Sequence, residues 1–251
     1  MKIKTIASGS KGNCSIILSK DTNIIIDMGI SYLTLKRSLE NNSLSFLDFN
    51  GILITHCHSD HTKGLTNIIK NTNLNIYIPE DMYDSLSKFI PRNRCTFVND
   101  NFQIGTLKIE LIHTSHDAPS SVGYIINDDN KKLSYVTDTG YINRKYLSKM
   151  IGCDAYLIES NHDEVMLMEG PYPRFLKERV ISDLGHLSNK TTTSYLKRIV
   201  RDNTKNIILA HISEKNNTYE KVYETITDEE SLKKINIIIA KQDEESPMIE
   251  V

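Results

Sequence analysis

Short runs of apolar, mostly β-branched residues recur along the chain and alternate with segments of helical periodicity. A run of this kind bounded by turn-forming residues predicts a strand. Ten such strands are expected, at residues 16–18, 24–26, 51–55, 76–78, 107–112, 123–126, 133–136, 155–158, 207–210 and 235–240. Apolar residues at three- and four-residue spacing predict helices at 32–40, 65–71, 80–89, 189–201 and 219–227, the fourth capped by Ser188.

This alternation predicts an α/β or α+β fold in which helices cover sheets. No repeat and no linker rich in glycine, serine or proline divides the chain, so we expect one domain over residues 1–251. No apolar run approaches the roughly 20 residues of a membrane span, and no signal-peptide pattern opens the sequence. The four cysteines form no CxxC pair. We therefore expect a reduced, cytoplasmic protein with no membrane partner.

Composition and charge narrow the possibilities only a little. The 251 residues are 39% hydrophobic and 25% charged, which excludes disordered, collagen-like and coiled-coil chains. The net charge of −2 provides no global basic field that would attract nucleic acid. Locally, however, residues 171–205 hold eight basic and three acidic side chains, and residues 206–251 hold five and ten. The basic stretch is either a solvated helical face or a surface that follows a phosphate backbone.

The most distinctive motif is the sequence THCHSDH at residues 55–61, directly after a predicted strand. His56 and His58 are two residues apart in an extended segment, so they point to the same side and can share one metal ion. Asp60 and His61 follow where the chain turns towards a helix and can reach a second ion. Three histidines and one aspartate suit Zn²⁺, Mn²⁺ or Fe, whereas Ca²⁺ and Mg²⁺ prefer mostly oxygen ligands.

An HxHxDH motif after a buried strand resembles the signature of the metallo-β-lactamase superfamily. Three further residues at strand ends resemble its later motifs: His116 in TSHD, Asp138 in VTDTG and His211 in ILAHIS. The resemblance implies a four-layer αββα sandwich, with two facing mixed sheets, outer helices and metal ions at one edge. It also implies a dinuclear centre in which one ion is held by His56, His58 and His116, the other by Asp60, His61 and His211, and both by Asp138.

Within the superfamily, several segments resemble the bacterial YycJ/WalJ group, which is regarded as a set of DNA exonucleases related to the tRNA 3′-processing endonucleases. These segments are ASGSKGN at 7–13, IDMG at 26–29, ESNHD at 159–163, SDLGHLSN at 182–189 and AHISEKNN at 210–217. His186 resembles a histidine that stabilises the scissile phosphate or protonates the leaving group in the tRNA-processing relatives. The alternative is that His186 only adjoins a helix cap.

Four residues are candidates for supporting or substrate-binding roles. Asp27 resembles the superfamily aspartate that accepts the distal N–H of a ligand histidine. His162 either lines the cleft or orients a loop, and Asn13 and Ser188 are further candidates in the matching segments. Cys57 should point away from its neighbouring histidines, so we interpret it as a packing residue.

Two divalent ions about 3.5–4 Å apart and bridged by a carboxylate lower the pKa of a bound water and supply hydroxide near neutral pH. The sequence therefore predicts a dinuclear hydrolase that uses Zn²⁺ or Mn²⁺, with Asp60, Asp138 and His186 as catalytic residues. The favoured reaction is that of a phosphodiesterase or nuclease, of the 5′ to 3′ DNA exonuclease type, with DNA favoured over RNA. The alternatives are a hydrolase of a small thioester, lactone or cyclic phosphodiester, and a binding module that uses metal only structurally.

Overall fold

Two seven-stranded mixed sheets lie face to face in the computed structural model, which describes residues 1–251. The first sheet has the order β14-β1-β2-β3-β4-β5-β6, comprising β1 Lys2–Ala7, β2 Cys14–Leu18, β3 Asn23–Ile26, β4 Gly51–Leu53, β5 Ile76–Ile78, β6 Cys95–Phe97 and β14 Ile249–Glu250. The second has the order β13-β12-β11-β10-β9-β8-β7, comprising β7 Asn101–Ile104, β8 Leu107–His113, β9 Val122–Asp128, β10 Lys131–Val136, β11 Ala155–Glu159, β12 Asn206–Ala210 and β13 Asn236–Ile239.

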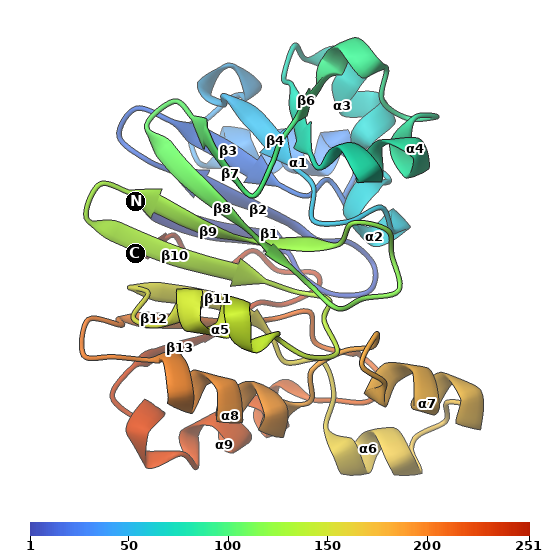
Figure 1. The fold of residues 1–251 in the computed structure, drawn as a ribbon, viewed down its shortest axis with the longest axis vertical. Helices are drawn as coiled ribbons and strands as arrows, with labels where there is room; N and C mark the ends of the chain where they lie inside the picture. The colour runs from blue at the N-terminus through green and yellow to red at the C-terminus, as the bar shows by residue number, and fades with distance from the viewer.

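Nine α-helices cover the sheets. They are α1 Tyr32–Asn41, α2 Ser59–Thr62, α3 Leu65–Asn71, α4 Tyr83–Leu86, α5 Arg144–Met150, α6 Glu164–Glu169, α7 Arg174–Ile181, α8 Asn189–Ile199 and α9 Tyr219–Thr227. Short 3-10 turns occur at Phe46–Asp48, Glu80–Met82, Arg92–Arg94 and Glu230–Leu232. In Figure 1, α1, α3 and α4 lie around β4 and β6 of the first sheet, and α5, α8 and α9 lie beside β11 to β13 of the second, in agreement with the predicted αββα arrangement.

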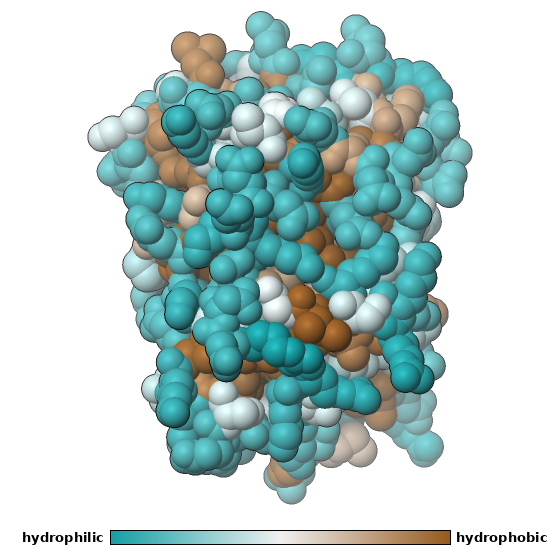
Figure 2. All heavy atoms as spheres, turned by 60° about the vertical axis from the view of Figure 1, so that its left-hand side comes forward, coloured by the Kyte–Doolittle hydropathy of each residue, from teal (hydrophilic) through white to brown (hydrophobic).

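Alternating burial along the strands explains this layering. In β11, Leu157 faces a core cluster that also contains Ile17 of the first sheet, so this cluster fills the space between the sheets. Its neighbours Tyr156 and Ile158 face a second cluster that contains Leu196 of α8 and Val222 of α9. Because successive side chains point to opposite faces, one strand joins both cores. On the face shown in Figure 2, hydrophilic residues predominate and hydrophobic ones emerge only as separate patches.

The strand pairing places the ends of several strands together. Strands β3 to β6 pair in parallel, as do β10 to β13, so within each set the carboxyl ends meet at one edge. Strand ends are where a sheet holds loop side chains rigidly in a common cleft. This edge carries the residues singled out in the sequence.

All ten predicted strands and all five predicted helices are present, with shifts at their ends. The segment predicted as a helix at 80–89 is divided between a 3-10 turn and α4. Four strands and four helices were not predicted: β1, β6, β7, β14, α2, α5, α6 and α7. The unpredicted α7 buries only Val180, so it has no apolar stripe to recognise. All four cysteines are free thiols, and none of the helices is both long and apolar enough to span a membrane; the cytoplasmic location stays a prediction.

Candidate metal centre

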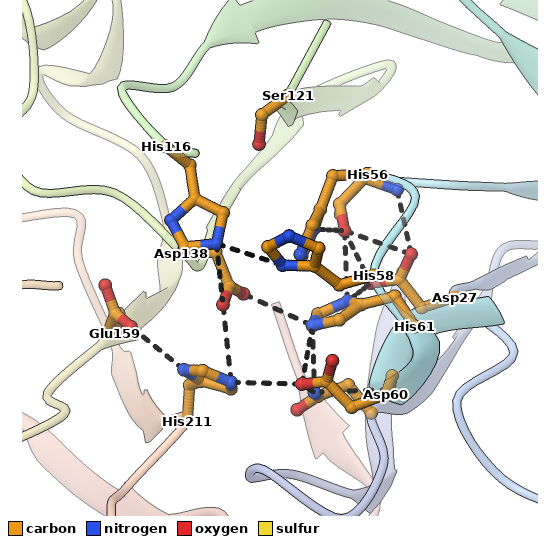
Figure 3. Close-up of polar contacts among 12 residues, drawn as sticks. Asp27, His56, His58, Asp60, His61, His116, Ser121, Asp138, Glu159 and His211 are labelled. Atoms are coloured by element: carbon orange, nitrogen blue, oxygen red, sulfur yellow. Dashed lines mark hydrogen bonds and ion pairs between the residues drawn. The ribbon is translucent and has the colours of Figure 1, made fainter. Parts of the chain in front are cut away.

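The seven residues predicted to hold metal ions lie together at the strand ends of both sheets. They are His56, His58, Asp60 and His61, which follow β4, together with His116, Asp138 and His211, which follow β8, β10 and β12. Figure 3 shows these side chains facing a common centre from opposite sides. Their ligand atoms form three overlapping groups of three, and Asp138 and His211 form a further group with Glu159 and His186; within each group all atoms lie within 4.8 Å of one another.

Two of the groups correspond to the two ligand sets that the resemblance implies, while a third joins His56 and His61 with Asp138. Nε2 of His116 lies 3.3 Å from Nδ1 of His58, and both belong to a group with His56. Asp60 Oδ2 lies 3.5 Å from His61 Nε2 and 3.6 Å from His211 Nε2, which form the other group.

Asp138 lies between the two groups. Its Oδ1 is 3.3 Å from Nε2 of His211 and 4.0 Å from Nε2 of His116, while its Oδ2 is 3.4 Å from Nε2 of His61. The carboxylate thus faces ligand atoms of both groups, which is the placement that a bridging ligand requires. We keep the bridging role as a proposal.

The polar atoms of this cluster fit divalent ions. Nε2 of His56, Nε2 of His211 and Oδ2 of Asp138 are buried and have no hydrogen-bond partner in the protein. Buried polar atoms are nearly always paired, so unpaired ones concentrated at one point need an explanation. Imidazole nitrogens and carboxylate oxygens together are suitable ligands for Zn²⁺ or Mn²⁺.

The backbone of the site is strained at three of its residues. Asp27, Asp138 and His211 have φ angles of 62°, 54° and 55°, in the left-handed region. Each lies directly after a strand or one residue beyond it. Non-glycine residues rarely adopt this conformation, although aspartate, asparagine and histidine do so more readily than others. Strain of this kind concentrates at functional sites, where the surrounding fold imposes it.

Burial also sets the ionisation of the cluster. It holds the pKa of His56 well below its usual range, helped by the nearby charge of His61, so His56 is the neutral imidazole that binds metals. Burial likewise lowers the pKa of His116. Burial would raise the pKa of Asp138, but the neighbouring His211 and His61 outweigh it and hold that pKa well below its usual range. Asp138 is therefore an ionised carboxylate, which is the form that binds metal ions.

Asp27 occupies the supporting position predicted for it. Its Oδ2 accepts a hydrogen bond from Nδ1 of His61 at 2.7 Å, and its two oxygens also accept from the backbone and hydroxyl of Thr55. With Nδ1 so engaged, Nε2 of His61 faces the other ligands. Asn13 also contacts this nitrogen, because its side-chain amide lies 3.0 Å from Nε2 of His61 and 3.4 Å from Oδ2 of Asp60.

The sequence analysis missed one buried residue of the site, Glu159 at the end of β11. Its Oε1 lies 2.6 Å from Nδ1 of His186 and 2.9 Å from Nδ1 of His211, and its Oε2 accepts the backbone amides of Thr139 and Leu187. Burial would raise its pKa, but the charge and hydrogen bond of His186, with that of His211, lower it to about 2. The available signal was an acidic residue at the end of a buried apolar run, similar to Asp138, which lies two residues after β10.

His186 lies beside the ligands at the edge of the cavity. Its Nδ1 is turned to Glu159, and the same nitrogen is 3.9 Å from Oδ1 of Asp138. The preceding carbonyl of Gly185 accepts a hydrogen bond from Nδ1 of His116 at 3.3 Å. The segment that carries His186 therefore also supports a predicted ligand.

His162 and Ser188 lie next to the cavity rather than in it. Both line a neighbouring hollow of about 330 Å³ that shares His186 with the main site. Ser188 caps α8 by accepting the amide of Thr191, and its hydroxyl donates to Glu164. The backbone carbonyl of His162 accepts the amide of Asn189, which agrees with the loop-orienting interpretation.

A cavity of about 420 Å³ is lined by His58, Asp60, His116, Asp138 and His211, but not by the fully buried His56 and His61. Of the eight basic residues between 171 and 205, only Arg179 lines it. Lys190, Lys197, Arg201 and Lys205 line other hollows, and the first two pair with Glu164 and Glu229 respectively. The basic stretch therefore does not form one surface beside the site, and for α8 the structure favours a solvated helical face.

Comparison with known proteins agrees with this geometry. Residues 22–212 match the family model of the beta-lactamase superfamily domain. The chain is 33% identical over 225 residues to exodeoxyribonuclease YycJ of Bacillus anthracis, covering 88% of this chain and 85% of that protein. It is 32% identical over 235 residues to exodeoxyribonuclease WalJ of Streptococcus pneumoniae serotype 2, covering 91% of this chain and 87% of that protein.

The fold has a solved counterpart in the metallo-β-lactamase fold protein YhfI from Bacillus subtilis. The two structures superpose with a TM-score of 0.71 at 14% identity, over 98% of this chain and 99% of that one. The chain thus belongs to the metallo-β-lactamase superfamily. It is a hydrolase of that fold, and its clustered histidines and aspartates indicate that it binds divalent metal ions.

Proposed function

We propose that this protein is a phosphodiesterase acting on nucleic acid, and specifically a 5′ to 3′ exonuclease on DNA. The observation that carries the proposal is one cavity lined by ligand residues together with His186, in a chain whose full-length relatives are named exodeoxyribonucleases. The preference for DNA over RNA is supported by the names of these relatives alone.

The proposed ligand set matches the groups seen in the structure. One ion would be held by His56, His58 and His116, the second by Asp60, His61 and His211, and Asp138 would contact both. When bound, two divalent ions activate a water molecule and neutralise charge that builds on the substrate oxygens.

The protein residues around the ions have separate tasks. Asp27 and Glu159 each accept an Nδ1–H, from His61 and His211 respectively, and so turn the Nε2 atoms of these histidines towards the ions. Glu159 engages Nδ1 of His186 in the same way, so Nε2 is the nitrogen left for the substrate; in the doubly protonated ring this Nε2–H would donate to the scissile phosphate or protonate the leaving oxygen.

We also infer that residues 1–251 act as a single domain. One core cluster of 42 buried residues draws on both sheets, and both sheets supply ligands to the same centre. Separating the two halves would expose the cluster and divide the ligand set.

The test is digestion of DNA and RNA labelled at one end, single-stranded and duplex, by metal-stripped protein supplied with Zn²⁺ or Mn²⁺. The matched control is Asp138→Asn, because asparagine tolerates the φ of 54° while removing the charge. Mononucleotides released from the 5′ end of DNA by the wild type alone are the expected result. Activity confined to RNA, or release from the 3′ end, would contradict the specificity. Inactivity on every polynucleotide, with two ions bound per chain, would favour a small ester or cyclic phosphodiester.

A further inference from the structure

Asp117, directly after the predicted ligand His116, connects the centre to helix α7. Its Oδ1 lies 3.6 Å from Nε2 of His58 and 3.4 Å from Nε2 of His116. Its Oδ2 accepts a hydrogen bond from Nε of Arg179 at 2.6 Å, and a second guanidinium nitrogen of Arg179 contacts the same oxygen. This one carboxylate thus joins two histidines of the ligand cluster to the only arginine that lines the cavity.

The orientation of His58 explains what Asp117 does. Nδ1 of His58 is the nitrogen turned towards the other ligands, since it lies 3.3 Å from Nε2 of His116. Nε2 is consequently the outer nitrogen, and its nearest acidic group is Asp117. A metal-binding histidine usually donates its outer N–H to such an acceptor, which fixes both the ring orientation and the tautomer.

Arg179 is held by Asp117 but keeps free donors. A guanidinium has five N–H donors, and the contacts to Asp117 involve only Nε and one terminal nitrogen. The side chain is 57% exposed and lines the cavity, so its other donors are open to a ligand there. Paired N–H groups of arginine match the oxygens of a phosphate.

The same pair lies close to the segment that carries His186. Just beyond α7, the chain folds back so that the amide of His186 donates to the carbonyl of Val180, and Gly185 accepts from His116. Asp117 and Arg179 therefore join the two sides of the cavity close to the point where α7 ends.

We propose that Asp117 is a positioning residue that orients His58 for metal binding, and that Arg179, which Asp117 holds, binds a phosphate of the substrate. The part that concerns Arg179 rests on the proposed function, because it assumes that the substrate carries phosphate. The part that concerns Asp117 depends only on metal binding.

The first experiment measures the affinity of metal-stripped protein for Zn²⁺ and Mn²⁺ by titration against a competing chelator. Asp117→Ala is expected to weaken the binding of one ion about 10–100-fold. Asp117→Asn should recover most of the affinity, because its amide oxygen can occupy the place of Oδ1 beside Nε2 of His58. The matched control is Asp100→Ala, which breaks an exposed aspartate–histidine contact of 3.0 Å to His113 and should change nothing.

Two results would overturn the role of Asp117. One is wild-type affinity in Asp117→Ala, with circular dichroism confirming the fold. The other is loss of one whole equivalent of bound metal in Asp117→Asn, which would make Asp117 itself a ligand.

The second experiment measures the binding of inorganic phosphate to the metal-loaded protein by calorimetry, together with KM and kcat for bis(p-nitrophenyl) phosphate. Arg179→Ala is expected to weaken phosphate binding and raise KM by about tenfold or more, with a much smaller change in kcat. Arg179→Lys should recover part of the loss. Arg174→Ala is the matched control, because Arg174 lies on the same helix in an exposed pair with Glu178.

Unchanged phosphate affinity in Arg179→Ala would overturn the role of Arg179. Phosphate binding requires no turnover, so the result stands whether or not the wild type digests a polynucleotide. Failure of the exonuclease proposal and failure of this one are thus separate outcomes.

Discussion

Glu159→Gln is the substitution that tests most directly how the centre is organised. Glu159 is fully buried and its Oε1 accepts from Nδ1 of both His186 and His211. Glutamine has nearly the same shape, and its amide oxygen can accept the same two hydrogen bonds from the backbone amides of Thr139 and Leu187. Its NH₂ group would then face the two Nδ1–H groups, so donor would meet donor.

The expected magnitude follows from the hydrogen bonds that the substitution removes. Two hydrogen bonds to a charged acceptor, at about 1.5–3 kcal/mol each, predict that the metal-stripped variant loses about 3–6 kcal/mol of unfolding free energy. The histidines can restore a hydrogen bond only by moving a proton from Nδ1 to Nε2. In His211 this blocks the atom that faces the metal, which predicts about 10–100-fold weaker metal binding. In His186 it leaves only the neutral ring, which is a weaker proton donor than the doubly protonated ring that Glu159 pairs with, and this predicts a fall of about 10²–10⁴ in turnover.

Three measurements check these values: denaturant unfolding of the stripped protein, metal titration against a chelator, and kcat for bis(p-nitrophenyl) phosphate. Glu110→Gln is the control. Glu110 lies on β8 away from the cavity and pairs with Lys149 of α5, so this substitution should leave metal affinity and turnover unchanged. If Glu159→Gln binds metal and turns over like the wild type, the two histidines are oriented by something else and the reasoning fails.

Four further outcomes are expected. Asp138→Asn should remain folded but lose metal-dependent turnover, and an active variant would rule out a shared ligand at this position. Metal removal should leave a chain that circular dichroism shows to be folded, because the core is large. Metal supplied at 100 times its Kd should raise the free energy of unfolding by about 2.7 kcal/mol. If the stripped chain is unfolded, the metal has a structural role instead. Replacing Lys197, Arg198 and Arg201 together by alanine should leave the salt dependence of DNA binding unchanged in fluorescence anisotropy, whereas a slope reduced by about three would show that α8 contacts phosphates. Leu157→Ala, in the core between the sheets, should cost about 2–5 kcal/mol in denaturant unfolding, and a loss below about 1 kcal/mol would contradict its packing there.

The sequence predicted the strands and the THCHSDH motif from strong local patterns, whereas the αββα arrangement and the later residues of the cluster came from the resemblance to the superfamily; the ligand roles stay predictions. The β-branched strands are buried on both faces and read as continuous apolar runs, as in β11 and β12. The motif at residues 55–61 places four ligands within six residues, and the later ligands each follow a strand. Such signals depend on neighbours in the sequence, so they need no tertiary information.

What the sequence could not predict depends on tertiary contacts. Glu159 acquires its role from two histidines that lie 27 and 52 residues away. Arg179 is one of eight basic residues in its stretch, and only the docking of α7 against Asp117 distinguishes it from the others. Exposed helices such as α7, and short edge strands such as β14, bury too little to produce a periodic pattern.

The left-handed backbone at Asp27, Asp138 and His211 is a conformational cost that the protein bears in order to place these three side chains in the centre. Glycine adopts such angles without steric cost, so at each of these positions it would relieve conformational strain while deleting a group on which the centre depends. Selection for resistance to heat would gain from glycine only where this relief exceeds the hydrogen bonds that are lost, such as those that Asp27 accepts from Thr55 and His61. Thermostabilisation of this enzyme should keep these three residues fixed and look for gains in the helices far from the strand ends.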